Sequence, residues 1–346
     1  MSYLVGIWCN WYRGMRTRPP VGHGIAICVA LVLIGAFGLA GAPLAAPPAA
    51  DRADPAPDAH TDARVDTLRI DASQVDTLAT FDDATVLHRD PRGRLYVLDP
   101  ERHRLYVLNA AGDRQRTIGG SGSRAGQFSR PAGIDPTNGQ TLLVADTGNG
   151  RIQRLDADGR PLELLPVSHR EEALAPVYRP ARDERAPTGT GRPTAVHSTA
   201  GDGLALIESD ARAVWYLDRQ RTLVRRLTPP DVPLARWQPH AIARSAPGDL
   251  WIVDAERPQV LITDSFGSIV STHTAPSDAG PFVDVFATGS AVGLVRAAGI
   301  TLHDASTYRA RQHIEWPATA APLRRVTASR DTLYLLAGPH LLSVHR

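Results

Sequence analysis

The 346-residue chain lacks lysine altogether, and it has only two cysteines. All 38 basic residues are therefore arginine, which we interpret as coding bias without chemical meaning. Cys9 and Cys28 both lie in the N-terminal segment, which has the features of a targeting leader. The rest of the chain, called the body below, consequently has no cysteine for disulfide bonds or thiolate metal sites.

The body also lacks an excess of basic charge. Three of the 38 arginines, Arg13, Arg16 and Arg18, belong to the leader, which leaves 35 arginines against 36 acidic residues. Nucleic-acid-binding proteins usually carry a basic surplus or a basic stripe. The balance therefore argues against a nucleic acid as partner.

Common catalytic motifs are missing as well. The sequence contains no G-x-S-x-G elbow, no H-E-x-x-H zinc motif, no P-loop and no EF-hand loop. The hydrophobic content of 43% is nevertheless that of a folded globular protein. These features favour a folded protein without a familiar hydrolase or nucleotide site.

One long hydrophobic run is present, at residues 25–42, and it follows the three leader arginines. Its most apolar part has the length of a signal-peptide core, and Ala40-Gly41-Ala42 has the form of a cleavage site, although Pro43 is expected to hinder cleavage. The 18 residues would also just span a bilayer. Two interpretations stay open, a cleaved signal peptide within 1–46 or a membrane anchor at 25–42.

Both interpretations place the body outside the cytoplasm, in the periplasm or the extracellular space. The start at Met1 or at Met15 is also left open, because the stretch before Met15 is long for a signal peptide. Residues 47–64 are rich in proline, alanine and aspartate and are expected to form a flexible linker.

The body repeats one phrase, a leucine-led strand that ends in an acidic residue. Four clear copies and two weaker ones follow each other at spacings of 47, 62, 46, 42 and 41 residues. The copies are LYVLD (95–99), LLVAD (142–146), LALIE (204–208), LWIVD (250–254), VGLVR (292–296) and LYLLA (333–337). A proline-led apolar strand precedes the phrase in most copies, and two further strand patterns follow it.

Four short strands in each unit of about 40–45 residues are typical of a β-propeller blade. A β-sandwich also has short strands, but it gives no reason for one phrase to recur six times. We therefore predict an all-β fold, a six-bladed β-propeller over residues 65–346. The last blade is one strand short and residues 65–71 are one strand in excess, so we expect this strand to complete the last blade, with Leu68 beside Leu342.

Residues 119–160 resemble an NHL repeat, on the motif GGSGSRAGQFSRPAGIDPTNGQTLLVADTGNGRIQRLDADGR. The first blade, from GRLYVLDPERHRLYVLN onward, is similar to the exported or membrane-anchored bacterial NHL-like propellers. Blades five and six lack the Asp-x-x-Asn-x-Arg turn. The resemblance implies a propeller used for binding, and it does not assign a function by itself.

In propellers, the turns between second and third strands lie on the same face as the loops between blades, around the mouth of the central channel. We predict that the ligand binds on this face, although Asp and Asn at such turns mostly cap their own backbone and Arg often packs on a neighbouring blade. The candidate ligand residues on this face are Asp99, His103, Arg104, Arg130, Asp146, Asn149, Arg151, Arg192, Gln238, His240, Asp254 and Arg257. Residues 168–191 form the longest connection, either a lid over this face or a floppy insertion.

Some related-looking propellers are metal-dependent lyases and lactonases, so a metal site is the alternative to a simple binding site. His88, Asp135 and His197 occupy equivalent inner-strand positions and offer a set of divalent-metal ligands. His240 lies at the start of the inner strand of blade four, whereas His88 and His197 lie toward the far ends of their strands. The three histidines are therefore not expected to converge. We predict no metal and no cofactor, with Ca or Zn as the alternative.

The sequence thus predicts an exported, non-enzymatic scaffold that binds a protein, peptide or glycan. The alternative is a metal-dependent lyase or lactonase. Membrane contact is expected only through the N-terminal anchor, if it is retained.

Overall fold

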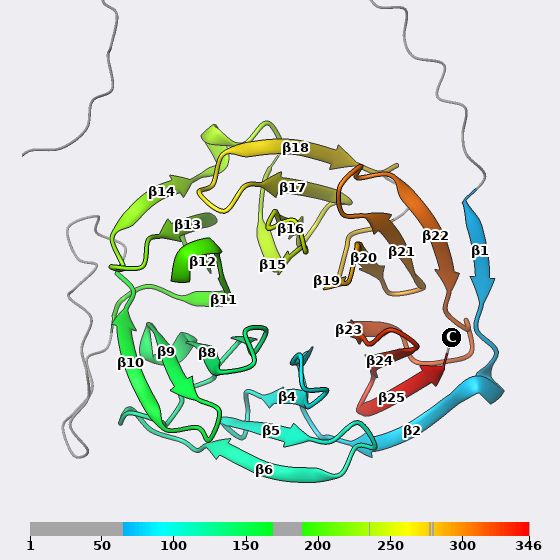
Figure 1. Cartoon of the computed structure of the whole chain (residues 1–346), viewed down its shortest axis with the longest axis horizontal. Helices are drawn as coiled ribbons and strands as arrows, with labels where there is room; N and C mark the ends of the chain where they lie inside the picture. The colour runs from blue at the N-terminus through cyan, green and yellow to red at the C-terminus, as the bar shows by residue number, and fades with distance from the viewer. Residues whose placement is uncertain (1–64, 169–188, 235, 277, 279, 346) are drawn as a thin grey trace, which may run out of the picture. The chain divides into compact units, whose positions relative to one another are not determined.

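The computed structural model describes residues 65–168, 189–234, 236–276, 278 and 280–345, and these residues form a ring of six β-sheets (Figure 1). The predicted leader (1–46) and linker (47–64) lie outside the described residues. No helix in the described part of the chain is long and apolar enough to cross a membrane. The predicted six-bladed β-propeller is confirmed.

Each blade has an inner strand at the channel, two middle strands and an outer strand. The inner strands are β3 (Val86–Arg89), β7 (Gly133–Asp135), β11 (Pro193–Ser198), β15 (Pro239–Arg244), β19 (Asp284–Thr288) and β23 (Leu323–Ala328). The second strands are β4 (Leu95–Asp99), β8 (Thr141–Asp146), β12 (Leu204–Glu208), β16 (Leu250–Asp254), β20 (Ala291–Arg296) and β24 (Thr332–Ala337). All six copies of the repeated phrase are therefore second strands.

The third strands are β5 (Arg104–Leu108), β9 (Arg151–Asp156), β13 (Ala213–Leu217), β17 (Gln259–Thr263), β21 (Gly299–Asp304) and β25 (His340–His345). The outer strands are β6 (Arg114–Gly119), β10 (Pro161–Pro166), β14 (Leu223–Leu227), β18 (Ile269–Thr274), β22 (Ala310–Glu315) and β2 (Val75–Thr80). Short 3-10 turns are η1 (Ala72–Gln74), η2 (Thr147–Asn149), η4 (Ala200–Asp202) and η5 (Pro229–Asp231).

The hydrophobic core lies between the blades. Among the described residues it divides into six clusters, one for each pair of neighbouring blades. Successive side chains of a strand point to opposite faces, so Leu95 and Val97 pack toward blade six while Tyr96 and Leu98 pack toward blade two. This packing explains why the second strands are apolar throughout, because both of their faces are buried.

The ring closes through an N-terminal strand, but not through the one that was predicted. β2 pairs antiparallel with β25, placing Thr77 opposite Leu342, and so completes blade six. Residues 66–69 instead form β1 (Asp66–Arg69), which lies parallel to β22 with Leu68 opposite Ile314. The prediction that residues 65–71 complete the last blade was wrong.

Chain connectivity gives the reason for this difference. In chain order, each outer strand precedes the inner strand of the next blade, and β2 is only a short loop away from β3. Phe81 and Ala84 in that loop are buried against blades one and six. β1 lies too far upstream for this role and adds a fifth strand to blade five, as Figure 1 shows.

Candidate functional site

The structure contains a pocket of about 370 Å³ at the mouth of the channel. It opens on the predicted face, because turn and loop residues from several blades form its rim, among them Pro100, Arg130, Ser209 and Gln238. We call it the channel-mouth pocket.

The floor of this pocket is built by one residue from each inner strand. Strand register aligns six residues, each opposite the fourth residue of its blade's repeated phrase. All six line the pocket, and we call them the channel ring: Val86, Gly133, Ala195, Ala241, Asp284 and Arg325. Four members are small or apolar, whereas the two from blades five and six carry opposite charges.

Asp284 and Arg325 form a loose ion pair. The Arg325 Nε atom lies 3.9 Å from the Asp284 Oδ1 atom, which is too long for a hydrogen bond. The Arg325 Nη1 atom donates to the carbonyl oxygens of Val283 and Arg324 at 2.5 and 3.0 Å. The guanidinium is thus fixed through Nη1, while Nε lacks a close partner.

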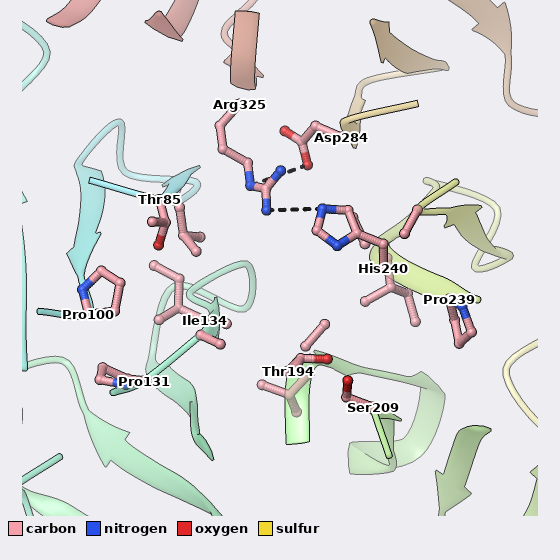
Figure 2. A pocket seen from close by; sticks show the side chains of 18 of the residues that line it. Thr85, Pro100, Pro131, Ile134, Thr194, Ser209, Pro239, His240, Asp284 and Arg325 are labelled. Carbon is pink, nitrogen blue, oxygen red and sulfur yellow. Dashed lines mark hydrogen bonds and ion pairs between the residues drawn. The ribbon is translucent and has the colours of Figure 1, made fainter. Parts of the chain in front are cut away.

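His240 stands beside this pair on the same wall of the pocket (Figure 2). Its Nε2 atom is 3.4 Å from the Arg325 Nη2 atom, a long contact. Burial, with the nearby charge of Arg325, lowers the pKa of His240 to about 4. The imidazole is therefore neutral at pH 7 and adds no charge to the site.

Burial dominates the electrostatics of Asp284 too. It raises the pKa of Asp284 to about 6, although the charge of Arg325 and the backbone N–H groups of Val326 and Val285 act in the opposite direction. The Val326 N–H donates to the Asp284 Oδ2 atom at 2.9 Å. A modest fall in pH below 6 would therefore protonate Asp284 and leave the charge of Arg325 uncompensated.

The rest of the lining is mostly apolar. Figure 2 shows Pro100, Pro131 and Ile134 on the side across from the charged pair, with Thr194 and Ser209 near the rim. None of the described lining residues is Phe, Tyr or Trp. One wall is thus polar and charged. The others are formed mainly by proline rings and small apolar side chains, with three hydroxyl groups, from Thr85, Thr194 and Ser209, and with Arg130 and Gln238 at the rim.

Three of the twelve predicted ligand residues, Arg130, Gln238 and His240, line this pocket. Arg130 has a positive φ of 40° and its backbone N–H donates to the His103 Nδ1 atom at 2.8 Å. His103 is thus placed as a support for the rim, and the backbone N–H of Gln238 is tied to Asp254.

The carboxylates at the ends of the second strands are committed to the backbone. Asp146, Glu208 and Asp254 each accept the N–H group of a residue just before the inner strand of the same blade, namely Ser129, Arg192 and Gln238, at 2.7–2.8 Å. Asp99 accepts the N–H of Arg102 in the following turn. All four carboxylates are fully buried, so their observed contacts are structural.

Asp146 also holds the motif on which the NHL resemblance depends. Its Oδ2 atom accepts hydrogen bonds from Asn149 Nδ2, Arg151 Nε and Gln153 Nε2, each at 2.8 Å. Arg151 is fully buried and donates in addition to the carbonyl oxygens of Ser123, Arg124 and Gln127. The Asp-x-x-Asn-x-Arg turn therefore fastens the loop that enters the blade.

The remaining candidates lie outside the pocket. Arg104 and Arg192 are exposed, and Arg192 makes a loose pair with Asp210 at 3.9 Å. Arg257 is partly buried and gives its backbone N–H to Asp254. The insertion at 168–191 was predicted as a lid or a floppy segment, and its residues 169–188 lie outside the described residues.

The candidate metal ligands do not form a metal site in the described part of the structure, where no group of three His, Cys, Asp or Glu side chains is placed to hold an ion. Asp135 accepts hydrogen bonds from both the N–H and the hydroxyl of Ser198 and Thr137, and it lies 3.4 Å from the His197 Nδ1 atom. His88 lines the pocket, and burial lowers its pKa to about 4. The donor set does not fit a resident ion.

Sequence reasoning missed Asp284 and Arg325, the only two charged members of the channel ring. The available signal was the inner-strand position at which blades one to four have Val, Gly, Ala and Ala. A charged residue at a position where the other blades keep a small apolar one marks a local departure from the repeat. The predicted ligand residues belong to turns, loops and strand ends of other blades, and the inner-strand residues predicted as metal ligands lie at a different strand position.

The fold and this pocket define a six-bladed β-propeller with a pocket at one end of its channel. No family model matches the sequence, and no curated protein does either. The NHL resemblance therefore stays a prediction from the motif.

Solved structures share the fold. A streptogramin B lyase has a TM-score of 0.55 at 13% identity, covering 78% of this chain and 97% of the lyase. Virginiamycin B lyase from Staphylococcus aureus, in a catalytically inactive form with quinupristin, has a TM-score of 0.52 at 13% identity, over 76% and 80% of the two chains. A gluconolactonase-like protein has a TM-score of 0.52 at 13% identity, over 79% and 91%. Identities this low show the fold alone.

Proposed function

We propose that the chain is an exported, non-enzymatic propeller that binds its ligand in the channel-mouth pocket. The observation that carries this proposal is the channel ring, which sets one charged pair into an otherwise small and apolar floor. Small-molecule and peptide sites usually have this composition, with apolar walls and a few well-placed polar groups. The leader at residues 25–42 supports export.

The volume of the pocket limits what enters it. About 370 Å³ lies near the lower end of the range for ligand pockets, so one side chain or one small molecule fills it. A protein, peptide or glycan partner would insert one such group, while the surrounding turns make the wider contact. The buried carboxylates of those turns are occupied by backbone donors, which leaves the pocket as the main chemical feature of this face.

Blocking the rim tests this proposal. Ser209 is exposed and lines the pocket, so Ser209→Trp would fill the mouth without touching the core. Ser290 is exposed on a turn between inner and second strands, at the opposite end of its blade, and Ser290→Trp is the matched control. In a fragment screen by ligand-observed NMR, we expect fragments that bind wild type and the control to be lost with Ser209→Trp. An unchanged set of bound fragments would refute the pocket as the ligand site.

The second candidate is a lyase or lactonase. It is favoured by fold neighbours that are a streptogramin B lyase, a virginiamycin B lyase and a gluconolactonase-like protein. The described residues do not supply a three-ligand metal set for it. Elemental analysis of purified protein, together with a lactone-hydrolysis assay with and without added Ca or Zn, separates this candidate from the first. Metal-dependent turnover would establish the enzyme.

A further inference from the structure

We infer that the group bound in the channel-mouth pocket is a carboxylate on an apolar body, held by the Nε and Nη2 atoms of Arg325. This inference rests on the proposed function and narrows its ligand class from proteins, peptides or glycans to acids. The carboxylate comes either from a free small acid or from the C-terminus of a peptide.

The first argument is the state of the Arg325 guanidinium. Its Nη1 atom is held by two carbonyl oxygens, so the plane of the group is fixed before a ligand arrives. The opposite edge keeps only long contacts, 3.9 Å from Nε to Asp284 and 3.4 Å from Nη2 to His240. Two parallel donors on one edge match the two oxygens of a carboxylate.

The second argument is the charge of the lining. Its ionised residues are Arg130, Arg325 and Asp284, so the described lining carries a positive surplus even when Asp284 is charged. His88 and His240 also line it, and both are neutral at pH 7 because burial lowers the pKa of each to about 4. An anion therefore gains from this pocket, whereas a cation would meet Arg325.

The third argument concerns the walls. Sugar rings commonly stack on aromatic side chains, and the described lining offers no Phe, Tyr or Trp for this purpose. Pro100, Pro131 and Ile134 instead provide an apolar surface across from Arg325 (Figure 2). This arrangement suits a ligand with an aliphatic or proline-like body that packs on these residues while its acid group reaches Arg325.

The test compares N-acetyl-leucine with N-acetyl-leucinamide, which have the same body and differ in the acid. By titration calorimetry on the full chain, we expect the acid to bind with a Kd on the order of 1 mM and the amide at least about tenfold more weakly. Arg325→Gln should remove this preference, Arg325→Lys should keep part of it, and Arg324→Gln, an exposed neighbour, should leave it intact. Thermal unfolding verifies that each variant is folded.

The pH dependence provides a second readout. Asp284 faces Arg325 and the N–H groups of Val326 and Val285, and Arg325 in turn faces His240. Protonation of Asp284 between pH 7 and 5 should strengthen acid binding several-fold, while both histidines stay neutral. The Asp284→Asn protein should bind the acid with the same affinity at both pH values, and more tightly than wild type does at pH 7.

The outcomes separate the two proposals. If both probes bind equally, and Ser209→Trp abolishes their binding, the pocket is the ligand site but the carboxylate inference is wrong. If neither probe binds while wild type still binds fragments that Ser209→Trp excludes, the carboxylate inference alone is overturned. If Ser209→Trp leaves all binding unchanged, both proposals are overturned. A tripeptide ending in leucine, as free acid and as amide, then distinguishes the sources, because only a C-terminal peptide site binds the tripeptide acid more tightly than N-acetyl-leucine.

Discussion

At Asp146, four donors converge on one buried carboxylate, and one of them is the fully buried guanidinium of Arg151. A buried ion pair contributes little net stability by itself, since both ions lose hydration. Removing only one partner is costly, because the other charge stays buried without compensation. The pair therefore acts as a fastening between the inter-blade loop and the turn after β8, and its role at this position is structural.

Replacing the carboxylate by an amide tests this role. Asp146→Asn should lower the free energy of unfolding by about 3–5 kcal/mol, because it leaves Arg151 unpaired and turns an amide N–H₂ toward other donors. The control is Asp158→Asn, which breaks the exposed pair with Arg116 and should cause no measurable change. Urea unfolding followed by tryptophan fluorescence measures both. An Asp146→Asn protein as stable as wild type would return Asp146 to the candidate ligand residues.

Two glycines separate backbone strain from steric overlap at the turns. Gly150 has φ of +62°, and an added Cβ would lie 2.3 Å from the Gly189 carbonyl oxygen. Gly201 has φ of +67° with no atom within 4 Å of such a Cβ. Gly201→Ala should therefore cost about 1 kcal/mol, from strain alone. Gly150→Ala should cost roughly 3 kcal/mol, from strain plus overlap with fixed backbone. Equal losses in denaturant unfolding would contradict this separation.

Among the elements, β1 and β2 show that pairing with a sheet and closing the ring are different tasks. All four residues of β1 are exposed, and its Arg69–Glu315 ion pair is on the surface, where such pairs contribute little. β2 covers the edge of β25, and Leu78 and Val75 pack against two inter-blade clusters. Closure protects an edge that would otherwise pair with other chains.

Truncation measures this difference between the two strands. A chain beginning at Ile70 loses β1 but keeps the buried Ile70 side chain, and we expect its Tm to fall by only about 2–4 °C relative to a chain beginning at Val65. A chain beginning at Phe81 loses β2 as well and opens the ring. Its Tm should fall by more than about 10 °C, with concentration-dependent association through β25. Similar behaviour of the two truncated chains in calorimetry and light scattering would contradict closure by β2.

The fold was predictable because the same strand pattern recurs in all six blades. The second strands that contain Leu95, Leu142 and Leu204 are buried on both faces. Their residues therefore stay apolar even where the turns between blades differ in sequence. The closing strand was harder to assign. Each of residues 75–80 is exposed or only partly buried, and VDTLAT resembles the VDTLRI stretch just before it. Only the pairing partner distinguishes two such strands, and a single sequence does not reveal it.

The site was predicted in part. Its face, the rim residues Arg130 and Gln238, and His240 follow from the strand order of a propeller blade. Asp284 and Arg325 lie in the two blades where the NHL-like motif has faded, and they meet only when the ring places blade five beside blade six. The distances that leave one edge of Arg325 available depend on side-chain packing, which strand patterns do not encode.

On the scale of the whole molecule, the packed ring withdraws several histidines from water, in the channel-mouth pocket and within the blades. His88, His240 and His303 belong to blades one, four and five, and burial lowers the pKa of each to about 4. A histidine whose folded-state pKa lies below its unfolded value of about 6.5 stabilises the fold above pH 6.5, and this contribution is lost as the pH falls through 4. The three histidines should therefore lower the free energy of unfolding as the pH falls from 6.5 to 4.

Asp284 has the opposite effect on stability, because its folded-state pKa of about 6 lies above the ordinary aspartate value of 3.8. Its contribution is fully present below pH 3.8 and is lost as the pH rises through 6. Three histidines outweigh one aspartate, so the free energy of unfolding should fall by a few kcal/mol between pH 6.5 and 4. Asp135, whose pKa is lowered despite its burial because of His197 and hydrogen bonds from Thr137 and Ser198, adds a further loss only below pH 3.8.

Asp284→Asn removes the contribution of the Asp284 carboxyl, which opposes that of the histidines, because the amide imitates the protonated acid at every pH. In urea unfolding we expect this variant to be more stable than wild type at pH 7.5 and equal to it near pH 4, so that its decline over the window is steeper. A single exposed histidine change, His340→Gln, is the control and should leave the profile unchanged. A wild-type stability that rises on acidification from pH 6.5 to 4 would mean that these histidines gain protons without cost, which contradicts their withdrawal from water in the folded ring.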